Sequence, residues 1–163
     1  DDVLEEIQAQ GEAYLTAHGF VNYEVSAWRK EKPSAHNLNY WQFGDYLAIG
    51  AGAHGKVTQP DGVYRFQKTR LPKDYLAKVP AENLQFKRIE ADDMPFEFMM
   101  NALRLNQGVD AKLYAERTGL SLAGLDEILS SLRARKLMVD DQTRISCTEQ
   151  GHVFLNSVLE EFL

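Results

Sequence analysis

Apolar side chains in the first part of the chain recur at helical spacing. The face that they form runs from about residue 2 to residue 17 and carries Val3, Leu4, Ile7, Tyr14 and Leu15. Gly19 follows this segment, and glycine readily adopts the left-handed conformation that ends many helices. Apolar and polar side chains then alternate between residues 21 and 27, which is typical of a strand. A helix that leads into a strand is the unit from which α/β barrels are built.

The middle of the chain is predicted to consist of short elements joined by turns. Pro33 disfavours helix just before it, so a helix is expected to begin near Ser34 or Ala35. The pattern then predicts a helix, a short buried strand, a glycine-rich turn, a β-hairpin, a second short helix and a linker (residues 35–41, 47–49, 50–55, 57–69, 71–79 and 80–88). The composition of the linker indicates a domain boundary near residue 89.

The last part of the chain has the order of elements found in a winged helix. A helix is expected from residue 93 to residue 106. Two helices, two short strands and a final helix follow it (residues 109–117, 121–135, 137–139, 144–147 and 148 onward). The sequence therefore predicts an α/β region over residues 1–88 and an α-helical, winged-helix-like domain over residues 89–163.

Charge is unevenly distributed along the chain. The net charge is −6, yet residues 53–88 hold eight basic side chains against three acidic ones, so this segment is +5 and the rest is −11. A basic segment of this kind suits a ligand that carries carboxylates. No apolar run approaches membrane-spanning length, and the first residues do not resemble a signal peptide. Cys147 is the only cysteine, which excludes an internal disulfide and agrees with a cytoplasmic location.

Aromatic residues, histidines and glycines are concentrated between residues 36 and 55. On a helix, His36 and Tyr40 share one face and Asn37 and Trp41 share the next, because residues four apart are neighbours. The glycines that follow would let backbone approach a ligand closely. A histidine beside aromatic rings, opposite a glycine turn, suits a flat and partly apolar ligand. An aromatic mini-core beneath a loop is the alternative interpretation.

The glycine-rich turn does not indicate a dinucleotide site. Residues 50–55 match the pattern G-x-G-x-x-G, but strand and turn residues follow them instead of a helix that could hold a pyrophosphate. Lys68 and Arg70 stand where an acidic residue should bind ribose. Between His36 and His54 no carboxylate or cysteine stands at ligand spacing except Asp45, which argues against a zinc site.

The winged-helix order does not indicate DNA binding in this chain. Asp126 and Glu127 lie at the start of the second helix, which is the end that would enter the major groove. Asp140 and Asp141 lie at the tip of the predicted wing, where they would repel phosphates. We therefore expect no nucleic-acid partner.

His-Asn-x-x-Tyr-Trp at residues 36–41, followed by Gly-x-Gly-x-His-Gly, resembles the oxygen-independent coproporphyrinogen III oxidase family, and within it the heme-chaperone (HemW-like) branch. The resemblance extends from residues 23–28 through 96–100 to 154–157. It implies the C-terminal part of a radical-SAM α/β barrel followed by the winged-helix-like domain. The three-cysteine motif of the family is absent, so the [4Fe–4S] cluster and S-adenosylmethionine would be held outside this chain, and the chain alone would not be catalytic.

The resemblance also implies a heme site at four matching residues, His36, Asn37, Tyr40 and Trp41. His36 Nε2 is the expected iron ligand, because neutral imidazole is a common protein donor to heme iron. Four residues of the glycine turn are expected to line the ligand (Gly50, Gly52, His54 and Gly55). From charge alone, four cations are candidates for contacts to heme propionates (Lys56, Arg65, Lys68 and Arg70).

The function implied by the resemblance is that of a heme chaperone, which binds heme and transfers it to acceptor proteins. The first alternative is the oxidase itself, which decarboxylates coproporphyrinogen III to protoporphyrinogen IX in heme biosynthesis. The second alternative is an interaction module that recruits a protein partner through the winged helix. Heme or a porphyrin and acceptor proteins are the expected partners, and a homodimer is a further expectation.

Overall fold

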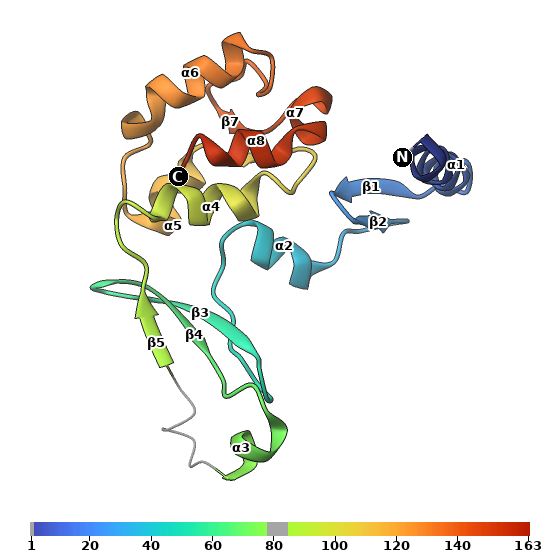
Figure 1. Ribbon diagram of the computed structural model, residues 1–163. Coiled ribbons are helices and arrows are strands. Elements are labelled where there is room, and N and C mark those ends of the chain that lie inside the picture. The colour runs from blue at the N-terminus through green and yellow to red at the C-terminus, as the bar shows by residue number, and fades with distance from the viewer. Residues whose placement is uncertain (1, 78–84) are drawn as a thin grey trace.

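The structure, a computed structural model, describes residues 2–77 and 85–163 of the chain (Figure 1). Its helices and strands are α1 (Asp2–Ala17), β1 (Val21–Glu24), β2 (Ala27–Arg29), α2 (Ala35–Trp41), β3 (His54–Gln59), β4 (Gly62–Gln67), α3 (Pro72–Ala77), β5 (Gln85–Arg88), α4 (Met94–Ala102), β6 (Val109–Asp110), α5 (Lys112–Thr118), the 3₁₀-helix η2 (Leu122–Leu125), α6 (Asp126–Ala134), β7 (Arg144–Ile145), α7 (Glu149–Val153) and α8 (Leu155–Glu160). Within these described residues, none of the helices has the length and apolar character needed to cross a membrane.

The N-terminal arm consists of α1 and the antiparallel pair β1–β2. The predicted helix from residue 2 to residue 17 is confirmed. The predicted strand from 21 to 27 is confirmed only as far as Glu24, where β1 ends. The backbone N–H and the hydroxyl of Ser26 donate to Glu24 Oε1 at 3.2 and 3.0 Å, which stabilises a turn. The chain therefore returns along β1 as β2. The arm forms a hairpin, so the barrel implied by the resemblance stays a prediction.

A three-stranded antiparallel sheet occupies the middle of the chain, in the order β3-β4-β5. The predicted hairpin is confirmed, with Thr58 opposite Val63 and Gln59 opposite Gly62 at its tip. The predicted buried strand over residues 47–49 is wrong. Leu47 is 76% exposed and Ile49 is 87% exposed, and both lie in a loop. The predicted helix over 71–79 is α3, and its expected end lies outside the described residues.

In the C-terminal region α5 and α6 correspond to the two predicted helices, but the prediction is wrong for residues 109 and 110, which form strand β6, and for 137–139, where no strand is formed. The helix predicted for residues 93–106 is shorter, because α4 ends at Ala102 and the chain then turns. β6 pairs with β7, and Met138 forms an isolated bridge with Cys147. The assignment as a winged helix, and the division of the chain at residues 88 and 89, stay predictions.

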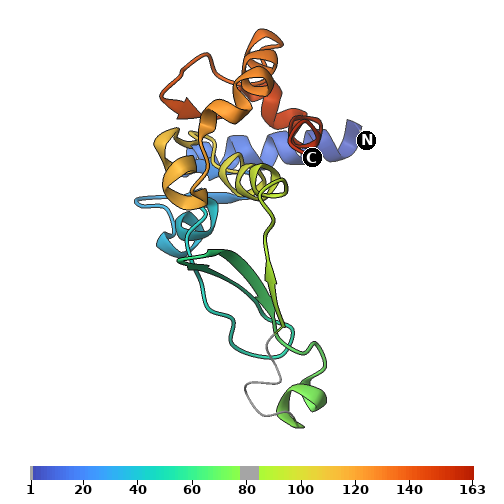
Figure 2. The same cartoon turned by 90° about the vertical axis from the view of Figure 1, so that its left-hand side faces the viewer.

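The core lies mainly among the C-terminal helices. The ring of Phe98 packs edge-on against Tyr114 at 5.1 Å and against Phe43 at 5.6 Å between ring centroids. Phe43 follows α2, and Val63 lies on β4, so the middle of the chain contributes to the same core. Figure 2 shows the resulting shape, in which the sheet hangs below the C-terminal helices and α2 lies at the junction. This junction positions the candidate site.

Candidate functional site

The helix α2 presents His36 and Tyr40 on one face. It begins directly after Ser34, whose hydroxyl accepts a hydrogen bond from the Asn37 N–H at 3.3 Å and so satisfies one of the unpaired N–H groups of the first turn. The rings of His36 and Tyr40 lie 4.7 Å apart in an edge-on arrangement, as the four-residue spacing predicted. His36 is exposed and has no hydrogen-bond partner among the described residues.

The second face of α2, with Asn37 and Trp41, is turned toward the rest of the protein. Asn37 Nδ2 donates to the Tyr23 hydroxyl at 3.0 Å, which ties α2 to β1. The Arg104 guanidinium lies 4.4 Å from the Trp41 ring, in a cation–π contact, and pairs with the buried Glu24 at 3.3 Å. These contacts fix the orientation of α2. The structure thus places the four motif residues on two faces, and of the four only His36 is exposed.

A row of contacts continues from Tyr40 to the sheet. The ring of Tyr46 lies 4.1 Å from that of Tyr40, and the Tyr46 hydroxyl accepts a hydrogen bond from Arg65 Nη1 at 2.9 Å. Arg65 also donates through Nε to Glu97 Oε2 at 2.8 Å. Burial opposes the charge of Arg65, but the contact with Glu97 outweighs it, so the pKa of the guanidinium is raised. The sequence interpretation missed Tyr46, because the i, i+4 pattern of α2 does not extend to it.

Lys56 is held inside the fold. Its side chain is 1% exposed, and its Nζ lies 2.8 Å from Asp45 Oδ1 and 4.3 Å from the centroid of the Phe43 ring. Burial lowers the pKa of the Lys56 ammonium, and the hydrogen bond to Asp45 offsets only part of this effect. Burial alone would raise the pKa of Asp45, but hydrogen bonds from Lys56 and Thr58 outweigh it and the pKa is lowered. Lys56 would have to leave this pair to contact a propionate.

The glycine turn (residues 50–55) is attached to the open end of the β3–β4 hairpin, opposite its tip. Gly50 and Gly52 have φ values of 99° and 72°, which glycine adopts without strain. The Gly52 N–H donates to the Thr69 carbonyl at 2.9 Å, and the Lys68 N–H donates to the Ala53 carbonyl at 2.8 Å. The turn is therefore joined to the end of the hairpin that also carries Lys68 and Arg70. The predicted lining and propionate residues are split between this end and the neighbourhood of Arg65.

Two members of the turn motif lie on β3. His54 is exposed at the start of the strand, where it pairs with Gln67. Gly55 lies beneath the ring of Phe66, because a Cβ at this position would come within 2.2 Å of that ring. Gly55 thus serves the packing of the sheet.

The chain does not provide ligands for an iron–sulfur cluster. Cys147 is its only cysteine and is buried in the C-terminal core, where burial raises the pKa of the thiol to about 12. Over residues 2–77 and 85–163 no group of three or more histidine, cysteine, aspartate or glutamate side chains could hold a metal ion. A [4Fe–4S] cluster, which needs several thiolates, does not fit these residues.

Comparisons with known proteins show which proteins the chain resembles. Residues 89–154 match the HemN C-terminal domain. The heme chaperones HemW of Haemophilus influenzae and Escherichia coli are each 43% identical to the chain over its whole length, which corresponds to 43% of each relative. The chain therefore carries a match to the HemN C-terminal domain and is similar to the heme chaperones HemW along its whole length. The heme chaperone HemW of Bacillus subtilis is 31% identical over 91% of the chain and 40% of that relative, so the chain spans less than half the length of these relatives.

One solved structure shares the fold. It is the coproporphyrinogen III oxidase HemN from Escherichia coli, described as a radical SAM enzyme. The TM-score is 0.65 over 96% of this chain and 40% of that chain, at 17% sequence identity. The likeness confirms a mixed α/β fold that the chain shares with HemN.

Proposed function

We propose that this chain supplies the heme-binding part of a heme chaperone, with His36 as the ligand to the heme iron. Two observations support the proposal. The relatives that match the chain over its whole length are named heme chaperones. The His36 imidazole is exposed on α2, touches only the edge of Tyr40 among aromatic neighbours and has no hydrogen bond to the described residues. An imidazole in this state is free to donate Nε2 to iron.

The residues around His36 would hold the cargo without enclosing it. Tyr40 presents a ring and a hydroxyl one helical turn from the ligand. Asn37 and Trp41 keep α2 fixed to β1 and to Arg104, so the His36 face is presented from a supported helix. A ligand held on an exposed face remains accessible to a second protein, and this access is what transfer to an acceptor requires. S-adenosylmethionine and the cluster would be held by residues outside this chain.

The chaperone is favoured over the decarboxylase by the degree of similarity. The oxidase HemN matches at 17% identity, which shows the fold alone, whereas the heme chaperones match at 43% identity. We also place His-Asn-x-x-Tyr-Trp at the centre of this function, because its first residue is exposed on α2 and packs on its fifth.

The test is hemin titration of the full protein that carries this chain, followed by Soret absorbance. His36→Ala is expected to weaken binding and to change the spectrum, because the axial ligand sets the electronic state of the iron. His54→Ala is the matched control, because His54 is also exposed but lies on β3. An unchanged spectrum in His36→Ala together with a lost Soret band in His54→Ala would assign the ligand to His54. If neither substitution matters, the α2 rings form only an aromatic mini-core.

A further inference from the structure

A cavity of about 410 Å³ opens on the sheet at the level of Arg65. Residues from all three strands line it: His54, Arg65, Phe66, Gln67, Phe86 and Lys87. The rings of Phe66 and Phe86 lie 5.1 Å apart on neighbouring strands, on the face of the sheet opposite the side chains of Arg65 and Lys87. The side chain of His54 shares the face of the two cations. Two cations beside a cavity fit a ligand with an anionic group.

The cations form a row across the sheet. Arg65 lies directly opposite Lys56 on one side and directly opposite Lys87 on the other. Residues paired in this way project from the same face, and like charges directly opposite each other destabilise a sheet. The row therefore needs compensating negative charge to be stable.

Only two of the three cations are compensated within the described residues. Asp45 pairs with Lys56 at 2.8 Å, and Glu97 pairs with Arg65 at 2.5 Å. Asp93 and Glu97 share a small adjoining cavity with Lys87, but no salt bridge to Lys87 is formed in the described part of the chain. Lys87 is exposed, so its ammonium is available to an anion from solution.

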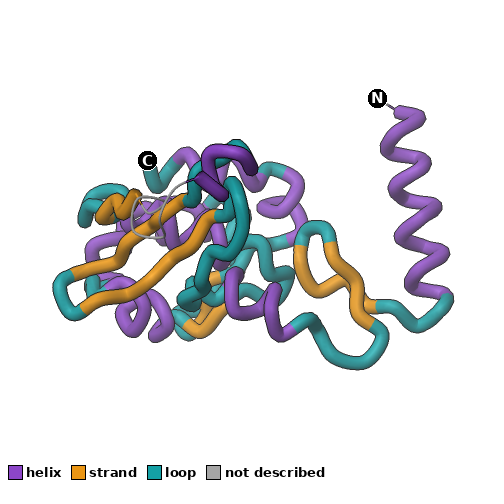
Figure 3. The backbone as a smooth tube through the Cα atoms, turned by 90° about the horizontal axis from the view of Figure 1, so that it is seen from below, coloured by secondary structure: helices purple, strands orange, loops and turns teal. Residues whose placement is uncertain are grey.

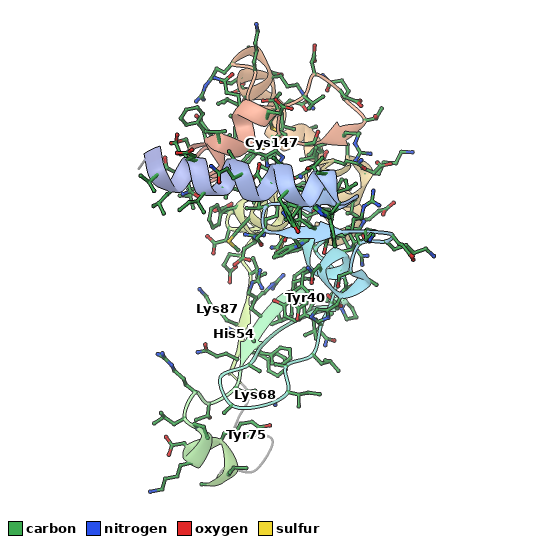
Figure 4. All side chains as sticks on the ribbon, turned by 90° about the vertical axis from the view of Figure 1, so that its right-hand side faces the viewer. Tyr40, His54, Lys68, Tyr75, Lys87 and Cys147 are labelled. Atoms are coloured by element: carbon green, nitrogen blue, oxygen red, sulfur yellow. The ribbon has the colours of Figure 1, made fainter. Side chains whose placement is uncertain are left out.

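The cavity is connected to the His36 face by direct contacts. Arg65, which lines the cavity, donates to the Tyr46 hydroxyl at 2.9 Å. Tyr46 packs on Tyr40 at 4.1 Å, and Tyr40 packs on His36 at 4.7 Å. Figure 4 shows Tyr40, His54 and Lys87 at one height of the molecule, with Lys68 and Tyr75 lower. These contacts lead from the His36 imidazole to Arg65, which lies opposite Lys87.

We propose that this cavity binds a propionate carboxylate of the heme, with Lys87 as its principal cation. The proposal rests on heme binding at His36. It replaces Lys56 and Arg65 as candidates for the propionate contact, because both already have carboxylate partners. Lys68 does not line this cavity but a second one, with Leu47 and Phe66. Lys87 then makes the site selective for tetrapyrroles with free carboxylates.

The test compares hemin with hemin dimethyl ester, which keeps the iron and the macrocycle but lacks the two carboxylates. Both are titrated into the full protein that carries this chain, as wild type and as Lys87→Gln. An exposed charge pair contributes about 0.2–1 kcal/mol, so Lys87→Gln should weaken hemin binding by up to about fivefold. The affinity for the ester and the Soret maximum should not change. Added salt should reduce the difference, because it screens exposed charges.

Two matched variants complete the design. Lys73→Gln removes the same charge from α3, away from the cavity, and should bind hemin as the wild type does. Lys87→Arg keeps the charge and should retain the affinity. The proposal is overturned if Lys87→Gln binds hemin normally or weakens hemin and the ester equally. In either case His36-dependent binding would stand, whereas failure of the wild type to bind either compound would remove both proposals.

Discussion

The helices α1 and α6 are both amphipathic, yet their apolar faces have opposite environments. In α6, Leu129 and Leu132 are 1% and 0% exposed. In α1, Val3 is 69% exposed and Ile7 is 62% exposed. Figure 3 shows α1 standing apart from the other elements, joined to them through the β1–β2 pair. The same spacing of apolar residues has produced a core helix in one region and an uncovered helix in the other.

The difference shows what hydrophobic period can and cannot predict. The period identifies the face of a helix that is apolar, whereas burial requires a complementary surface from another element. The C-terminal helices supply such surfaces to one another, with Phe98 and Tyr114 at the centre. No described element packs over the face of α1 that carries Val3 and Ile7. The stability of this chain should therefore reside in the C-terminal region, and the following predictions test that division.

The largest expected effect is on the reactivity of Cys147. Burial raises the pKa of its thiol to about 12, and the thiolate is the reactive form. Compared with an ordinary cysteine of pKa about 8.5, the thiolate population at neutral pH falls on the order of 10³-fold. A coloured thiol reagent should therefore label the native chain at least this much more slowly than the chain unfolded in urea. Labelling at similar rates in both conditions would show that the C-terminal core is open.

A second prediction compares one leucine and one isoleucine. Leu132→Ala should lower the free energy of unfolding by about 2–5 kcal/mol, because it leaves a cavity in a packed core. Ile7→Ala on α1 should change it by less than about 0.5 kcal/mol, because the side chain is already in water. Urea unfolding followed by circular dichroism measures both values. Equal losses would mean that α1 is packed in solution, and the contrast between the regions would disappear.

The sequence predicted the elements whose signals are local. Helix α1, the start of α2 and the hairpin β3–β4 follow from spacing, from Ser34 and from the Pro60-Asp61-Gly62 turn. The predictions from sequence are wrong where contacts with other parts of the chain determine the local structure. The apolar run from Leu47 to Ile49 predicts a buried strand, yet it lies in a loop with the side chains of Leu47 and Ile49 exposed. β1 ends at Glu24 because the carboxylate of this residue accepts a hydrogen bond from the Ser26 N–H. The period of apolar residues does not indicate such a contact.

The candidate site was also only partly predictable. The four-residue spacing placed His36 beside Tyr40. Tyr46 joins them because the loop after α2 folds back, and no motif indicates this. Lys87 faces Arg65 through strand register, a relation between residues far apart in the chain. Charge counting detected a basic segment, but it could not separate a paired cation such as Lys56 from Lys87, which forms no salt bridge with the described residues.

The pair of Asp45 and Lys56 gives a prediction of intermediate size at the boundary between the regions. Because the folded-state pKa of Asp45 is lowered, its contribution to stability is present above its unfolded value of about 3.8 and is lost as the pH falls through the folded pKa. Asp45→Asn should remove this acid dependence and cost about 1 kcal/mol at neutral pH, because Lys56 loses a charged partner. Asp140→Asn, in an exposed turn, is the control. Parallel pH profiles for wild type and Asp45→Asn would contradict the pairing.

The smallest expected effect concerns glycine in α1. A Cβ at Gly11 would meet no atom within 4 Å, so Gly11→Ala should favour the helix by about 0.5–1 kcal/mol through backbone entropy. Because α1 is not packed on the core, this stabilisation should raise the helix content of the folded protein. The rate at which a thiol reagent labels Cys147 should not change. Gly151→Ala is the counterpart in α7, where the new Cβ would come within 1.9 Å of the Leu137 carbonyl oxygen and must destabilise the core. A Gly11→Ala protein whose Cys147 became better protected would show that α1 and the C-terminal core unfold together.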